Sequence, residues 1–89
     1  MRQKEAIKVK REILSECSGF VLERCISLSS VVPANPKTLD DYEHYEVRIR
    51  CMVDDDLRTC IYRVVSRNRL ETRQERNELV IYRPIDKSI

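Results

Sequence analysis

The chain has 89 residues, of which 42% are apolar and 36% are charged. A chain of this length buries about 60–65% of its unfolded surface, which suffices for one modest core, so we expect a single domain over residues 1–89. Its formal net charge of +2 is too small to make nucleic-acid binding the default function, and no apolar run approaches the ~20 residues of a membrane span.

The charges are distributed unevenly along the chain. Residues 1–11 carry five basic side chains against Glu5, and residues 58–76 carry six arginines against two glutamates. Residues 37–57 hold seven acids against three basic residues. Such polarity acts on association with partners rather than on the fold. The N-terminal segment lacks the apolar stretch of a signal peptide, so we expect a cytoplasmic protein with reduced thiols.

The spacing of apolar residues predicts an amphipathic helix from Arg2 to Ser18. The apolar positions are Ala6, Val9, Ile13 and Cys17, with Ile7 and Leu14 beside them. Gly19 is the only glycine and follows the last of these positions, where a left-handed residue commonly ends a helix. We therefore expect Gly19 to terminate the helix and Phe20 to fold back on Leu14.

Residues 20–32 fit both alternation and a helical stripe, and we favour a strand because Val31 and Val32 are β-branched and Pro33 stops the run. The prolines at 33 and 36 predict a loop. Residues 38–41 are compatible with one helical turn before the next element.

Residues 42–67 predict a β-hairpin. Val47 and Ile49 alternate with charged residues before the acidic turn at residues 54–56, and residues 57–65 carry apolar residues at both parities, as in a strand covered on both faces. A four-residue loop would place Cys51 opposite Cys60. A three-residue loop would shift the pairing by one residue and turn the side chains of the second strand to the opposite face. The residues that we expect to be largely buried in the core are Ile13, Leu22, Ile49 and Tyr62.

Residues 66–78 are almost wholly polar and fit either an extended two-stranded ribbon or a short helix that begins at Thr72. Leu79–Tyr82 then predicts the last strand, since Pro84 follows it. The predicted fold class is α+β, with an N-terminal amphipathic helix packed on an antiparallel sheet of about four strands.

We expect no metal site and no cofactor. The four cysteines at positions 17, 25, 51 and 60 contain no C-x-x-C pair, and His44 does not lie at zinc-finger spacing from them, so they are best interpreted as small buried apolar residues. The acidic group at residues 54–56 lacks the glycine and the distant glutamate of a calcium-binding loop.

Arginine side chains carry the functional prediction, because the planar guanidinium suits carboxylate and phosphate partners. We predict a non-catalytic protein-interaction module that faces an acidic partner surface, with the acidic turn orienting the partner. Binding of a nucleic-acid backbone is the first alternative, and homodimerisation stays open. The predicted partner-binding residues are Arg63, Arg67, Arg69, Arg73, Arg76, Asp54, Asp55 and Asp56.

A second alternative rests on His44 with Arg67 and Arg69, since basic groups stabilise a scissile phosphate and histidine moves protons. This set resembles, at the level of class, compact toxin endoribonucleases that display arginines on an antiparallel sheet. The resemblance implies ribonuclease activity, but a helix before any strand departs from their order of elements.

Overall fold

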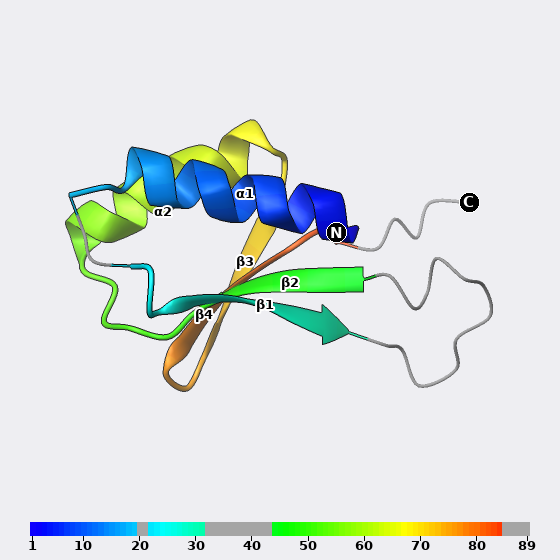
Figure 1. The fold of residues 1–89 in the computed structure, drawn as a ribbon. Coiled ribbons are helices and arrows are strands. Elements are labelled where there is room, and N and C mark those ends of the chain that lie inside the picture. The colour runs from blue at the N-terminus through cyan, green and yellow to red at the C-terminus, as the bar shows by residue number, and fades with distance from the viewer. Residues whose placement is uncertain (20–21, 32–43, 85–89) are drawn as a thin grey trace.

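The computed structural model describes residues 1–19, 22–31 and 44–84, which form two helices and one four-stranded antiparallel sheet (Figure 1). The elements in chain order are α1 (Gln3–Glu16), β1 (Ile26–Val31), β2 (His44–Ile49), α2 (Asp55–Arg67), β3 (Glu71–Glu75) and β4 (Glu78–Tyr82). The strand order is β1-β2-β4-β3, and both helices cover the same face of the sheet. This arrangement confirms the predicted α+β class with an N-terminal helix on an antiparallel sheet.

The core lies between the helices and the sheet. On α1, Ala6, Val9 and Ile13 are fully buried because they recur at helical spacing and share one side of the helix. Strand register places alternate residues on the helix-covered face, where Ile49 pairs with Ile26 on one side and Leu79 on the other. The predicted burial of Ile13, Leu22 and Ile49 is confirmed.

The strand predicted in residues 20–32 is present as β1, so the helical alternative for residues 26–31 is wrong. Gly19 does not have the predicted left-handed conformation. The helix ends at Glu16, and Cys17 follows as its C-cap with φ −102° and an N–H that donates to the carbonyl of Ile13. The contact of Phe20, the proline loop and the turn at residues 38–41 lie outside the described residues.

The predicted hairpin is wrong in its second half, because residues 55–67 form α2 rather than a strand. Asp54 caps the helix, and the buried residues Leu57, Ile61, Val64 and Val65 have the spacing of one helical face. Apolar residues at both odd and even positions therefore reflect the spacing of a helix and not a strand that is covered on both faces. Cys51 precedes the helix and does not oppose Cys60 across a sheet, and Tyr62 is 37% exposed instead of buried.

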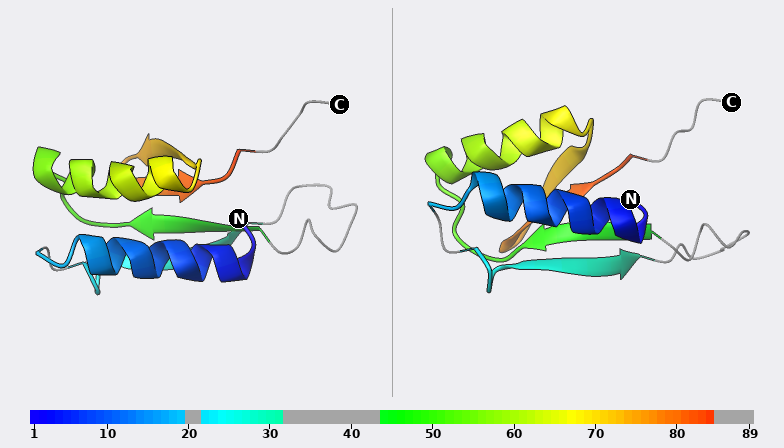
Figure 2. Two further views of the ribbon diagram at one scale, coloured as in Figure 1. Left: turned by 90° about the horizontal axis from the view of Figure 1, so that it is seen from above. Right: turned by 45° about the horizontal axis from the view of Figure 1, so that its top comes forward.

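The polar segment 66–78 contributes β3, so the short-helix alternative is wrong. The segment does not form a two-stranded ribbon by itself, because β3 pairs with β4 and residues 66–67 belong to α2. Glu75 pairs with Glu78, and the two-residue turn Arg76-Asn77 joins the strands. β4 contains the predicted strand Leu79–Tyr82 and inserts between β2 and β3. The connection from β2 to β3 therefore passes over the sheet through α2 (Figure 2).

Candidate functional site

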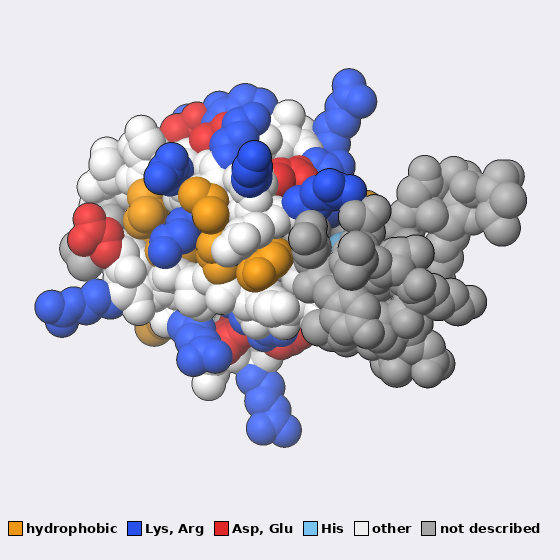
Figure 3. Space-filling model, turned by 45° about the vertical axis from the view of Figure 1, so that its right-hand side comes forward, with side chains coloured by type: hydrophobic (Ala, Val, Ile, Leu, Met, Phe, Trp, Pro, Cys, Tyr) orange, Lys and Arg blue, Asp and Glu red, His pale blue; other side chains and the backbone are white. Residues whose placement is uncertain are grey.

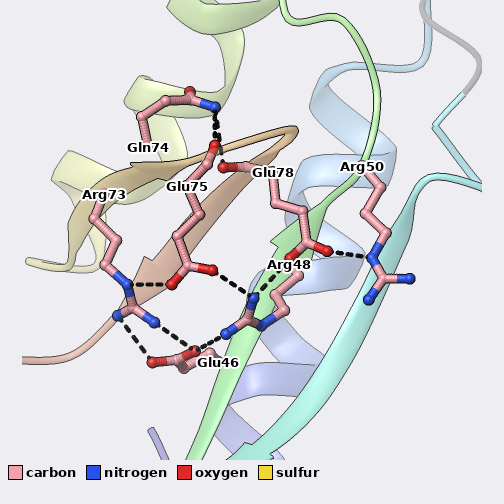
Figure 4. Close-up of polar contacts among 7 residues, drawn as sticks. All are labelled: Glu46, Arg48, Arg50, Arg73, Gln74, Glu75 and Glu78. Atoms are coloured by element: carbon pink, nitrogen blue, oxygen red, sulfur yellow. Dashed lines mark hydrogen bonds and ion pairs between the residues drawn. The ribbon is translucent and has the colours of Figure 1, made fainter.

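The sheet face turned away from the helices carries a network of alternating positive and negative side chains (Figure 4). Arg48 on β2 donates to Glu75 at 2.9 Å, to Glu78 at 2.7 Å and to Glu46 at 3.1 Å. Arg73 on β3 forms ion pairs with Glu46 and Glu75, each at 2.9 Å. The strand register produces this network, since Arg48 and Arg73 both pair with Val80 of β4 from opposite sides.

The charged side chains of this network cover the sheet face that lies opposite the helices. Val80 has no exposed surface, yet it does not belong to the apolar cluster under the helices. Arg73 also lies over the ring of Tyr82, with its guanidinium carbon 5.1 Å from the ring centroid. Hydrogen bonds from Arg48 hold the pKa of the Glu78 carboxyl below its ordinary value. Arg73, a predicted partner-binding residue, is therefore engaged within the molecule.

Arg67 is engaged in the same way, between the two helices. Its guanidinium forms ion pairs with Glu16 at 2.5 Å and Glu12 at 3.0 Å, both on α1. The side chain of Asn68 donates to the same Glu12 carboxylate at 2.8 Å. Hydrogen bonds from Asn68 and Arg67 lower the pKa of the Glu12 carboxyl. Arg67 thus joins α2 to α1.

The three predicted aspartates belong to the N-terminus of α2 and do not form a hairpin turn. Asp54 is the N-cap, and its carboxylate accepts a hydrogen bond from the backbone N–H of Leu57 at 2.8 Å. Asp55 and Asp56 occupy the first turn, where negative charge interacts favourably with the helix dipole. The N-cap contact and the helix dipole therefore account for the acidic cluster without a binding partner.

The other predicted arginines are exposed. Arg63 lies on α2, and Arg69 follows that helix with φ 56°. Arg76 lies in the turn between β3 and β4. Within the described part of the chain, no ion pair is formed by any of these three side chains. The arginines predicted as one surface are therefore divided between structural and solvent-facing positions.

A groove of about 660 Å³ lies between the β2–α2 connection and the β3–β4 turn. Three arginines from three parts of the chain line it: Arg50 follows β2, Arg58 belongs to α2, and Arg76 lies in the turn. We call it the arginine groove. Its full lining is Arg50, Cys51, Met52, Val53, Asp54, Arg58, Gln74, Arg76, Asn77 and Glu78.

The three guanidinium groups of the arginine groove differ in their partners. Arg50 forms an ion pair with Glu78 at 2.5 Å and remains 68% exposed (Figure 4). Arg58 donates to the hydroxyl of Tyr62 at 3.2 Å and lies over its ring at 5.9 Å. The hydroxyl of Thr72 and, to a smaller extent, the guanidinium of Arg58 lower the pKa of the Tyr62 hydroxyl. Arg76 makes no ion pair with the described residues, so its fork of donors faces solvent.

Apolar surface adjoins these charges. Met52 is 97% exposed, and Cys51 and Val53 beside it are partly buried. Methionine and arginine are both enriched where proteins bind each other, and a large exposed apolar side chain next to free donors offers a partner two kinds of contact. The arginine groove is the part of the described surface that combines these properties.

Sequence reasoning identified Arg76 and Asp54 in this groove but not Arg50, Arg58 or Met52. The signal for Met52 was present, because alternation in residues 46–53 places it on the outward parity. Arg58 could not be placed, since the prediction assigned it to a strand. Gln74 contributes a positioned amide, which donates to the carbonyls of Glu75 at 2.8 Å and Glu78 at 3.0 Å.

Comparison of the chain with protein-family models, curated proteins and solved structures gave no match. Neither helix in the described part of the chain is long and apolar enough to cross a membrane. Across residues 1–19, 22–31 and 44–84, no three His, Cys, Asp or Glu side chains are grouped as metal ligands.

Proposed function

We propose that the chain is a non-catalytic protein-interaction module whose arginine groove binds an acidic segment of a partner protein in the cytoplasm. The observation that carries the proposal is the position of Arg76 and Arg58 beside the almost fully exposed Met52. The guanidinium groups of Arg58 and Arg76 would bind carboxylates of the partner, and Met52 would pack on an apolar side chain next to them.

The energetics of the individual arginines support this proposal. Arg76 has no ion pair to break among the described residues, and Arg58 holds only a neutral hydroxyl, so both guanidinium groups are free to bind a carboxylate. The pair of Arg50 with Glu78 is solvent-exposed on the arginine side, where ion pairs contribute little and exchange readily. A bidentate carboxylate contact with Arg76 is therefore the expected anchor.

The groove favours a polypeptide over a nucleic acid. Glu78 and Asp54 contribute two negative charges against the three arginines, which would repel closely spaced phosphates. No aromatic side chain lines the groove for base stacking. The apolar residues Met52 and Val53 instead suit a side chain of a peptide.

The test measures binding of a fluorescent peptide that alternates Glu and Leu, at about 150 mM salt. Arg58→Ala with Arg76→Ala should weaken binding by about tenfold or more, because two charge-assisted contacts are lost. The matched control is Arg63→Ala with Arg69→Ala, which removes the same charge outside the groove and should change affinity by less than about twofold. Equal loss in both double variants would mean that net charge, and not the groove, determines binding.

Nucleic-acid binding is a second candidate because of the outward side of α1. Lys4, Lys8 and Arg11 are exposed there, and Lys8 forms an ion pair with Glu12 at 3.8 Å. Glu5 and Glu12 also bind Arg83 and Arg67. Figure 3 shows Lys and Arg side chains projecting from the surface, with Asp and Glu side chains and hydrophobic side chains between them. Duplex RNA and DNA binding with a steep salt dependence, lowered by Lys4→Ala and Arg11→Ala and unaffected by the groove variants, would favour this candidate.

The ribonuclease alternative receives no support from these contacts. The Arg67 guanidinium that it would use is bound by Glu12 and Glu16. To stabilise a scissile phosphate, Arg67 would first have to exchange one of these carboxylates for the phosphate. We therefore do not propose a catalytic role for Arg67 with His44.

A further inference from the structure

All four cysteines lie at the same end of the molecule, although they are far apart in the sequence. Cys17 ends α1, and Cys25 immediately precedes β1. Cys51 follows the end of β2, and Cys60 lies within α2. The turn from α1 to β1 and the connection from β2 to α2 meet at this end (Figure 1), so the fold gathers the thiols.

Cys25 and Cys51 lie beside each other where the pairing of β1 with β2 ends. The carbonyl of Cys25 accepts the backbone N–H of Arg50 at 2.8 Å, which extends the β1–β2 pairing by one residue beyond Ile26 and Ile49. The chain bends at Cys51, directly after Arg50. Burial raises the pKa of the Cys51 thiol, and the neighbouring Cys25 thiol raises it further.

Cys17 and Cys60 form a second pair, between the helices. Cys17 is only 1% exposed, and Cys60 packs against the same apolar cluster. Burial raises the pKa of the Cys17 thiol, and the neighbouring Cys60 thiol raises it further. The ion pairs of Arg67 with Glu12 and Glu16 hold α1 beside α2, so the packing of the helices keeps this pair together.

We propose that the four cysteines are two dedicated oxidisable pairs, and that Cys25 with Cys51 is a disulfide modification site in the wall of the arginine groove. Cys51 lines that groove between Arg50 and Met52, whereas Cys25 approaches from the start of β1. A disulfide here would tie the groove wall to β1. This inference does not depend on which partner the groove binds.

A low-molecular-weight dialkyl disulfide, such as oxidised glutathione, is the oxidant that the proposal names. The Cys25 thiolate attacks one sulfur of this disulfide, forming a mixed disulfide and releasing one thiolate. The Cys51 thiolate then attacks the Cys25 sulfur, forming the protein disulfide and releasing the second thiolate. Two protein thiols are oxidised, one small disulfide is reduced to two thiols, and the protons of Cys25 and Cys51 end on the released thiols.

Burial sets the rate and the order of oxidation. It raises the pKa of Cys51 to about 11, so the thiolate is scarce at neutral pH and the closing step accelerates about tenfold per pH unit between pH 7 and pH 9. It also raises the pKa of Cys17 to about 11. Because Cys17 is almost inaccessible while Cys25 is only partly buried, the Cys25–Cys51 bond should form first.

The experiment incubates the folded full chain with oxidised glutathione at about pH 8, blocks free thiols, and maps disulfides by peptide mass spectrometry without reduction. The expected linkages are Cys25–Cys51 and, more slowly, Cys17–Cys60. A dominant Cys51–Cys60 or Cys17–Cys25 bond, or glutathione adducts with no internal bond, would overturn the inference. The wild-type result decides between these outcomes without any variant.

Two variants sharpen this measurement. Cys25→Ser should abolish the groove disulfide and leave Cys51 free or joined to glutathione. The matched control Cys60→Ser removes one thiol from the other pair and should leave the rate of Cys25–Cys51 formation within about twofold of wild type. If Cys60→Ser slowed that bond as strongly as Cys25→Ser, the two pairs would not be independent and the assignment would be wrong.

Discussion

The carboxylate of Asp54 accepts the backbone N–H of Leu57 at 2.8 Å, and this contact begins α2. Replacement of an N-cap aspartate leaves a helix N–H without its partner. We expect Asp54→Ala to lower the free energy of unfolding by about 1 kcal/mol, measured by urea denaturation. Asp55→Ala keeps the cap and alters only the helix dipole interaction, so its loss should be smaller. Equal losses would show that the cap is not the stabilising contact.

Ile49 of β2 pairs with Ile26 of β1 and with Leu79 of β4 on the helix-covered face, and it has no exposed surface. Ile49→Ala should lower the free energy of unfolding by about 2–4 kcal/mol, through lost transfer energy and the cavity that remains. Met52→Ala provides the control, because Met52 is 97% exposed and its loss should change stability by less than about 0.5 kcal/mol. A small effect at Ile49 would contradict the position of β2 in the centre of the sheet.

Acid should destabilise the fold through its paired glutamates. Hydrogen bonds from Arg48 and Arg73 lower the folded-state pKa values of Glu78 and Glu75 below their ordinary value of 4.5. Each group therefore contributes stability that is present above pH 4.5 and is lost as the pH falls through the folded-state pKa. Urea unfolding between about pH 3 and pH 6 should show this decline, and Glu78→Gln should flatten it. The exposed Glu23→Gln should leave the profile of the wild type.

The backbone of Arg69 predicts a substitution that stabilises the protein. Arg69 has φ 56°, which is the left-handed region, and it is the only non-glycine residue with positive φ in the described part of the chain. Since glycine adopts this conformation without strain, Arg69→Gly should raise the free energy of unfolding by about 0.5–1 kcal/mol. Arg63→Gly removes the same side chain within α2 and should lower it by about 1 kcal/mol. Thermal unfolding of both variants measures this difference in sign.

The sequence allowed the prediction of elements whose signal is local. The apolar periodicity of α1 and β2 and the continuous apolar run of β4 are each followed by burial, and the fold class depends on these elements. α2 was predicted as a strand because apolar residues at both parities were attributed to a two-sided strand, although Asp54 followed by a stripe at Leu57, Ile61 and Val64 is a helix signal. The N-cap at Asp54 was stronger evidence than the apolar residues at odd and even positions.

The candidate site depends on relations that no local pattern contains. Arg50, Arg58 and Arg76 meet only because β4 returns beside β2 and α2 crosses above the sheet. The engagement of Arg73 likewise follows from a register that places it across Val80 from Arg48. Identifying the free arginines therefore requires the strand order, and the sequence prediction grouped the engaged Arg67 and Arg73 with the exposed Arg63, Arg69 and Arg76.

The insertion of β4 between β2 and β3 has a consequence for synthesis on the ribosome. During translation, β1 and β2 can pair, but β2 and β3 each lack a neighbour until residues 78–82 have left the exit tunnel. The nascent chain then presents two open strand edges, which are templates for association with other chains. Because the closing contacts join distant parts of the chain, we expect chaperones that shield exposed strands to improve the yield of folded protein.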